Sequence, residues 1–137
     1  MTIPSLKASI VFESDTMDCF RSNSNVVHAY IKDDVIADLD MVKENVDLII
    51  KVSNKKRLPV MVNINGLKGK KEGALEYANN VNYLHMSAIA IVSDRTLANL
   101  IGNLYVYLNR NKIPVKIFRK SGPAIDWIEE LKAKGTI

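Results

Sequence analysis

The sequence predicts one α/β domain over residues 1–137, with a mixed β-sheet that begins antiparallel and ends parallel and about four α-helices packed mainly on one face. Short strand-like runs fill the first thirty residues, and strands this closely spaced pair most simply as antiparallel hairpins. From residue 58 onward strand-like and helix-like segments alternate, which is typical of parallel strands joined by right-handed crossovers. The length of 137 residues suits a single domain.

The first strands are predicted at 8–14, 17–22 and 25–31, where apolar residues lie between polar turn segments. The hydrophobic period then changes to three and four, which predicts an amphipathic helix over 38–53. The apolar residues that carry this period are Leu39, Val42, Val46, Ile49 and Ile50.

The second half of the chain predicts three strands, each followed by a helix. The strands are expected at 58–64, 87–92 and 113–118, and the helices at 71–83, 95–110 and 122–134. The continuous apolar runs PVMV and AIAIV suit strands that are buried on both faces. Asp94 is placed to cap the helix 95–110, and Gly122-Pro123 marks the start of the last helix.

Composition points to a soluble, cytoplasmic protein without a transmembrane segment. Hydrophobic residues make up 47% and charged residues 25% of the chain, and no apolar run approaches the roughly 20 residues that cross a bilayer. The N-terminal residues MTIPSLKAS lack the apolar core of a secretory signal. The single cysteine, Cys19, allows no intramolecular disulfide, which fits a reducing compartment.

The basic residues do not predict nucleic-acid binding. The formal net charge is +4, from 19 basic and 15 acidic residues. The basic residues gather in short clusters at 55–57, 68–71 and 116–120, without aromatic residues spaced for base stacking or a recognisable reading helix. We therefore expect no nucleic-acid partner.

The stretch NINGLKGKKEG, residues 63–73, lies between a strand and a helix, where phosphate-binding loops lie. It fails the P-loop pattern, because Lys71 stands where the second glycine is needed and no Ser or Thr follows. What remains is a flexible basic turn, and either this turn or the opening of the helix 95–110 could attract an anion. The interpretation that we favour for the turn is that its glycines only form it and its lysines only meet water. The candidate anion- or ligand-binding residues are Asn65, Gly66, Lys68, Lys70, Asp94, Arg95 and Thr96.

The helix expected at 95–110 is unusually apolar. Nine of the twelve residues from Leu97 to Leu108 are apolar, whereas an ordinary surface helix leaves about half of its circumference polar. Twelve residues are too few to span a membrane, so the helix either lies between layers of the core or packs against a second molecule. We favour an interface for a homodimer or protein partner, with the candidate residues Leu97, Leu100, Ile101, Leu104, Tyr105 and Leu108.

No motif in the chain predicts catalysis, a metal or a cofactor. His28 and His85 have no second histidine or cysteine at ligand spacing. Cys19 lies on a predicted strand and is interpreted as a small buried hydrophobic residue. Because no reactive group is placed beside an activator, an enzyme is the least favoured of three functional classes.

Three segments resemble an uncharacterised bacterial subgroup of the STAS-like superfamily, the fold of anti-sigma-factor antagonists: VNINGLKGKKEGALEYA (62–78), residues 88–118 and AIDWIEEL (124–131). The resemblance covers residues 25–134. It implies a compact α/β domain with a mixed sheet that acts by non-covalent association.

Anti-sigma-factor antagonists are switched by phosphorylation of a serine at the start of the helix that follows the central strand. The corresponding residues here are GLKGKKEG, without Ser or Thr, so no phospho-switch is evident. We therefore expect a non-catalytic protein-interaction or regulatory domain that forms a dimer through the apolar helix. The alternative, since the wider fold includes lipid-binding domains, is a small-molecule or lipid-binding domain with an apolar pocket.

Overall fold

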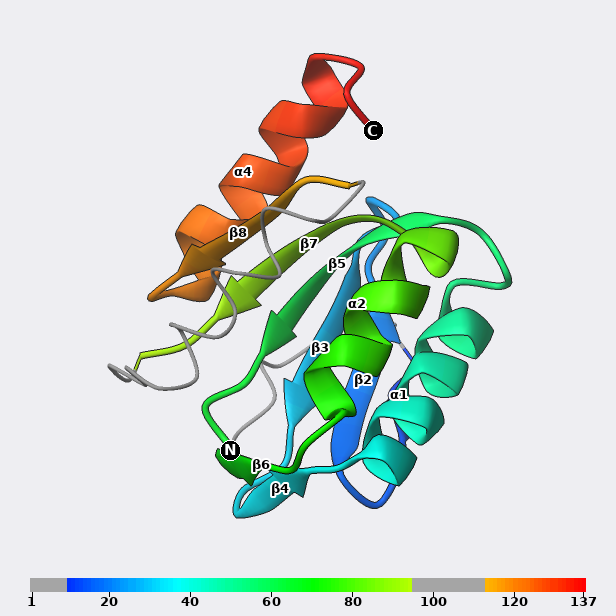
Figure 1. Cartoon of the computed structure of the whole chain (residues 1–137). Coiled ribbons are helices and arrows are strands. Elements are labelled where there is room, and N and C mark those ends of the chain that lie inside the picture. The colour runs from blue at the N-terminus through cyan, green and yellow to red at the C-terminus, as the bar shows by residue number, and fades with distance from the viewer. Residues whose placement is uncertain (1–9, 95–112) are drawn as a thin grey trace.

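The computed structural model describes residues 10–94 and 113–137. Its centre is a six-stranded sheet with the order β1-β2-β3-β5-β7-β8 (Figure 1). The strands are β1 Phe12–Glu13, β2 Met17–Arg21, β3 Val27–Ile31, β5 Leu58–Asn63, β7 Met86–Val92 and β8 Val115–Phe118. The pairs β1–β2 and β2–β3 are antiparallel, and β3–β5, β5–β7 and β7–β8 are parallel. The predicted mixed sheet is therefore confirmed.

Among the described residues, three helices cover this sheet from both sides: α1 Leu39–Val52, α2 Ala74–His85 and α4 Ser121–Ala133. Helices α1 and α2 share one face, and α4 packs against the other (Figure 1). The helix predicted at 95–110 lies outside the described residues, so a fourth helix stays a prediction. Within the part of the chain that is described, no helix combines the length and the apolar character needed to cross a membrane.

Strand β7 shows how the sequence builds two cores. Ile89 and Ile91 belong to the apolar cluster under α1 and α2, whereas Ala90 and Val92 belong to the cluster under α4. Successive side chains of a strand point to opposite faces, so a strand covered on both sides needs a continuous apolar run. The run AIAIV therefore predicted this strand and its double burial correctly.

Helix α1 begins and packs as its pattern indicates. The Asp38 carboxylate accepts a hydrogen bond from the backbone N–H of Met41 at 2.8 Å, which caps the helix. Val46, Ile49 and Val52 are buried against the sheet. Apart from the first strand, of which only Phe12–Glu13 is a strand among the described residues, the predicted elements that are described end within three residues of their expected positions.

The sequence analysis missed a second sheet of two parallel strands, β4 Val35–Ala37 and β6 Leu67–Lys70. The interpretation of residues 63–73 as a flexible turn is therefore wrong for β6. Leu67 is buried, and the backbone N–H of Lys71 donates to the Ala37 carbonyl at 2.7 Å, directly after the ladder. These backbone hydrogen bonds hold β6 in a strand, although its sequence shows no alternation of apolar and polar residues.

Candidate functional site

Two residues proposed for anion binding meet at the carboxyl ends of β5 and β7. The backbone N–H of Asp94 donates to the side-chain oxygen of Asn65 at 2.8 Å. The backbone N–H of Asn65 donates in turn to the side-chain oxygen of Asn63 at 3.0 Å. An anion cradle needs backbone donors that have no protein acceptor, and these two donors already have one. The polar edge formed by Asn63, Asn65 and Asp94 is therefore held together by its own hydrogen bonds.

Gly66 has a structural role at this edge. A Cβ atom there would overlap with the carbonyl oxygen of Lys32 and would lie 2.5 Å from the carbonyl oxygen of Ile31. The Gly66 carbonyl also accepts a hydrogen bond from the backbone N–H of Val35 at 3.1 Å. Glycine is required here because two backbone segments approach each other closely, which goes beyond the simple turn that the sequence suggested.

Of the remaining candidates, the structure describes Lys68 and Lys70. Lys68 and Lys70 are exposed residues of β6. Arg95 and Thr96 lie outside the described residues, and so do all six interface candidates, Leu97, Leu100, Ile101, Leu104, Tyr105 and Leu108. Their roles stay predictions.

The buried titratable groups have environments that suit packing. Burial, with a smaller contribution from Asp18, raises the pKa of the Cys19 thiol to about 12, so the thiol stays protonated at neutral pH and is a poor nucleophile. Burial lowers the pKa of His28, whose ring stacks on Phe20 with centroids 4.6 Å apart. Burial also raises the pKa of Tyr30. Each group is thereby held in its neutral form.

On the surface of α4, a hydrogen bond from Lys134 lowers the pKa of the Glu130 carboxyl. The two side chains are 2.6 Å apart and both are exposed, as in an ordinary helical ion pair at i,i+4. Among residues 10–94 and 113–137, no three His, Cys, Asp or Glu side chains are grouped as a metal site would require.

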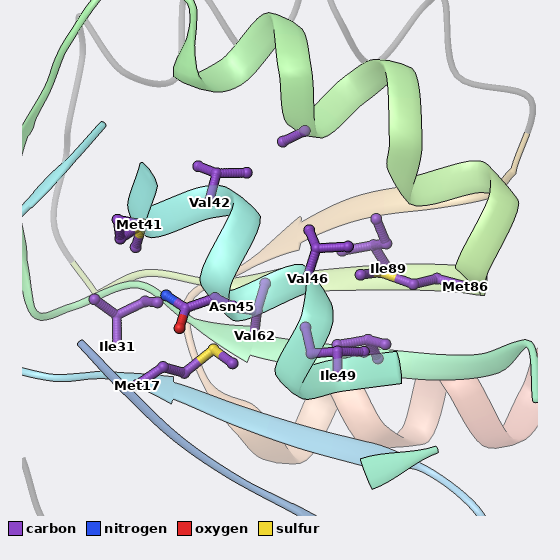
Figure 2. A pocket seen from close by; sticks show the side chains of 12 residues that line it. Met17, Ile31, Met41, Val42, Asn45, Val46, Ile49, Val62, Met86 and Ile89 are labelled. Atoms are coloured by element: carbon purple, nitrogen blue, oxygen red, sulfur yellow. The ribbon is translucent and has the colours of Figure 1, made fainter. Parts of the chain in front are cut away.

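A cavity of about 120 Å³ lies between α1, α2 and the sheet (Figure 2). We call it the α1–α2 cavity. Among the described residues that line it, Asn45 supplies the one polar side chain. The lining residues are Met17, Ile31, Met41, Val42, Asn45, Val46, Ile49, Val60, Val62, Ala78, Met86 and Ile89.

The burial of the lining shows where the cavity comes nearest to solvent. On the sheet side, Met17 is only 1% and Met86 only 3% exposed, while Val62 on β5 is half-buried. Met41, Val42 and Ala78 are half-buried and belong to the first turns of α1 and to α2. The cavity therefore approaches the surface between these two helices.

Asn45 is buried on α1, with 5% of its surface exposed. Its side-chain oxygen accepts a hydrogen bond from the Ser14 hydroxyl at 2.6 Å, and its amide nitrogen donates to the Thr16 hydroxyl at 2.8 Å. These bonds tie the turn before β2 to α1. A primary amide has two N–H donors and two acceptor lone pairs, so these two bonds use one donor and one lone pair of Asn45 and leave one of each.

Sequence reasoning did not identify this cavity. It placed Val42, Val46 and Ile49 on the core side of α1, and all three line the cavity, but it assigned no binding role to them. The available signal was Asn45, a polar residue within the same apolar stripe. A polar side chain that is buried in such a stripe needs partners, and it marks the position where the core is not purely apolar.

Residues 20–132 match the family described as "Domain of unknown function (DUF7793)", and the chain belongs to that family. No curated protein matches it.

A similar solved structure is the crystal structure of an uncharacterized protein of the DUF3478 family with a SpoIIAA-like fold, from Shewanella loihica PV-4. The TM-score is 0.57 at 14% sequence identity, and the match covers 90% of this chain and 98% of that chain. At this identity the likeness concerns the fold. The STAS-like fold that the sequence resemblance indicated is confirmed.

Proposed function

We propose that this chain is a non-catalytic, cytoplasmic regulatory domain of STAS-like type that acts by binding a protein, in the first instance a second copy of itself. The observation that carries the proposal is the sequence of residues 97–108, in which nine of twelve residues are apolar. An apolar stretch of this kind is suited to an interface, because packing it against a partner removes it from water. The SpoIIAA-like fold supports a role in non-covalent association rather than in catalysis.

Size-exclusion chromatography with light scattering tests this proposal on the wild type beside Leu108→Asp and Tyr105→Asp. We expect a wild-type dimer and folded monomeric variants, because a charge in an apolar contact is costly to desolvate. The matched control is Leu84→Asp, since Leu84 is 53% exposed on α2 and its replacement should leave the dimer intact. A wild-type monomer whose Leu108→Asp variant unfolds would show that residues 97–108 belong to the core.

A second candidate function is the binding of a small apolar molecule, and the α1–α2 cavity favours it. Among the described residues, eleven apolar side chains and one amide line the cavity, which matches the composition of ligand sites, in which few polar groups orient a mainly apolar ligand. Native mass spectrometry of the purified protein tests this function. A co-purifying mass is expected, whereas a clean unliganded mass together with no thermal shift across a ligand panel would argue against it.

A further inference from the structure

We propose that the α1–α2 cavity binds a ring-sized, mainly apolar molecule with one hydrogen-bonding group, which pairs with the side-chain amide of Asn45. This inference rests on the second candidate function and adds the size and chemistry of the ligand. It excludes a complete long-chain lipid as the occupant of this cavity.

The volume sets the size of the ligand. An engineered apolar cavity of about 150 Å³ stays dry and accepts benzene or xenon. The α1–α2 cavity, at about 120 Å³, is slightly smaller and suits a molecule of one small ring or a short branched chain. An acyl chain of about sixteen carbons has several times the volume of such a ring, so only its end could enter.

The lining explains how a ligand could enter without unfolding the core. Three methionines, Met17, Met41 and Met86, line the cavity, and their unbranched side chains adapt to irregular shapes better than branched ones. Met41 is half-buried and lies on the first turn of α1, on the side where the cavity approaches solvent. We expect adjustment of this side chain to widen the approach.

The amide of Asn45 supplies the specificity. The side chain is fixed by Ser14 and Thr16, at 2.6 and 2.8 Å, so its orientation is set before a ligand binds. Figure 2 shows it extending from α1 toward Met17 and Ile31, which also line the cavity. A hydroxyl on the ligand can accept from the remaining N–H or donate to the remaining lone pair, whereas a purely apolar ligand leaves both unused.

The test uses phenol and toluene, which have nearly the same shape and differ in the hydroxyl group. The readout is the methyl resonances of 13C-labelled methionine, together with the side-chain NH2 resonances of Asn45. We expect both probes to shift the methyls of Met17, Met41 and Met86, and phenol alone to shift the Asn45 amide. Met61 is the internal control, because it is buried in the cluster on the α4 side of the sheet and should not move.

Variants that fill the cavity complete the test. Ala78→Leu should weaken phenol binding at least ten-fold, while Ala133→Leu, the same change at an exposed position of α4, should leave it unchanged. If Ala78→Leu does not fold, Val62→Ile adds a single methylene at a half-buried lining position and should weaken phenol binding by a smaller factor.

Unmoved methionine methyls at saturating phenol, or equal shifts of Met61 and Met17, would overturn the inference. So would equal responses of the Asn45 amide to phenol and toluene. The broader small-molecule function is tested separately from this site. If a ligand co-purifies but its removal leaves the methyls of Met17, Met41 and Met86 unshifted, the small-molecule function is retained and its site lies elsewhere.

Discussion

The polar edge of the sheet and the α1–α2 cavity belong to the same domain but differ in whether their hydrogen-bonding groups are already paired within the protein. At the edge, the backbone donors of Asn65 and Asp94 already pair with the side chains of Asn63 and Asn65. In the cavity, the amide of Asn45 is fixed by two hydroxyls and keeps one donor and one acceptor beside an open volume of about 120 Å³.

This difference teaches that a conspicuous loop is not necessarily a binding site. The glycines and lysines of residues 66–70 drew attention because they resemble a phosphate-binding loop, yet the structure uses Gly66 for close backbone packing and residues 67–70 for a strand. A ligand needs space, and unused hydrogen-bonding groups orient it; among the described residues the cavity offers space and lies beside Asn45.

The largest expected effect is that of Gly66→Ala. Its Cβ would overlap with the Lys32 carbonyl oxygen, and backbone cannot give way as a flexible side chain can, so we expect a loss of about 3 kcal/mol or more of unfolding free energy. Urea denaturation measures it. The matched change Gly69→Ala places a Cβ where no other atom lies within 4 Å, and it should stay within about 0.5 kcal/mol of the wild type. Equal unfolding free energies of the two variants would contradict the structural role assigned to Gly66.

An intermediate effect is expected for Asn45→Ala. The change breaks the hydrogen bonds to Ser14 and Thr16 and enlarges the cavity, which together should cost about 2–3 kcal/mol of unfolding free energy. Asn65→Ala removes the acceptor of a single exposed hydrogen bond and should cost about 1 kcal/mol. If chemical denaturation finds Asn65→Ala to be the more damaging change, the polar edge contributes more to the fold than the buried amide does.

The smallest expected effect is a pH dependence from His28. Because burial lowers the pKa of His28 in the folded state below its usual value of 6.5, the unfolded chain binds the proton first as the pH falls. Stability should therefore decrease as the pH falls from 6.5 toward the folded-state pKa, and become independent of this group below it. The His28→Phe variant keeps a ring to stack on Phe20 and should lose this part of the dependence.

The His28→Phe variant also tests whether a change on one face of the sheet affects ligand binding on the other face. His28 stacks on Phe20, which belongs to the cluster on the α4 side, whereas the cavity lies under α1 and α2. Phenol affinity, compared between wild type and His28→Phe at one pH near 6.5, should thus be the same. An identical pH profile of stability for both proteins would contradict the assigned role of His28.

The main elements could be predicted because their patterns are long and local. The period of residues 39–50 and the run AIAIV each specify an element and the side that it buries. Strands β4 and β6, of three and four residues, are too short to show a period, and they exist because each supplies backbone partners to the other. The need for glycine at position 66 arises from contact with Ile31 and Lys32, more than thirty positions earlier in the chain, which no local pattern reveals.

The candidate site was predictable only in part, for a related reason. Parallel neighbouring strands bring their carboxyl ends to one edge, so residues after β5 and β7 could be expected to meet, and Asn65 and Asp94 do. A cavity, in contrast, is the small remainder left when α1, α2 and the sheet pack together, and side chains that differ by one methylene can open or close it. Sequence identifies which residues face the core but not where the core is incompletely filled.

The most direct measurement is a pair of NMR titrations on one sample, with inorganic phosphate and then with phenol, following the backbone amides of Asn65 and Asp94 and the methyls of Met17, Met41 and Met86. The account predicts that phenol shifts the three methyls in a saturable manner and that phosphate leaves the two amides unmoved. Saturable phosphate shifts at Asn65 and Asp94, with methionine methyls that ignore phenol, would contradict it and move the binding site to the polar edge.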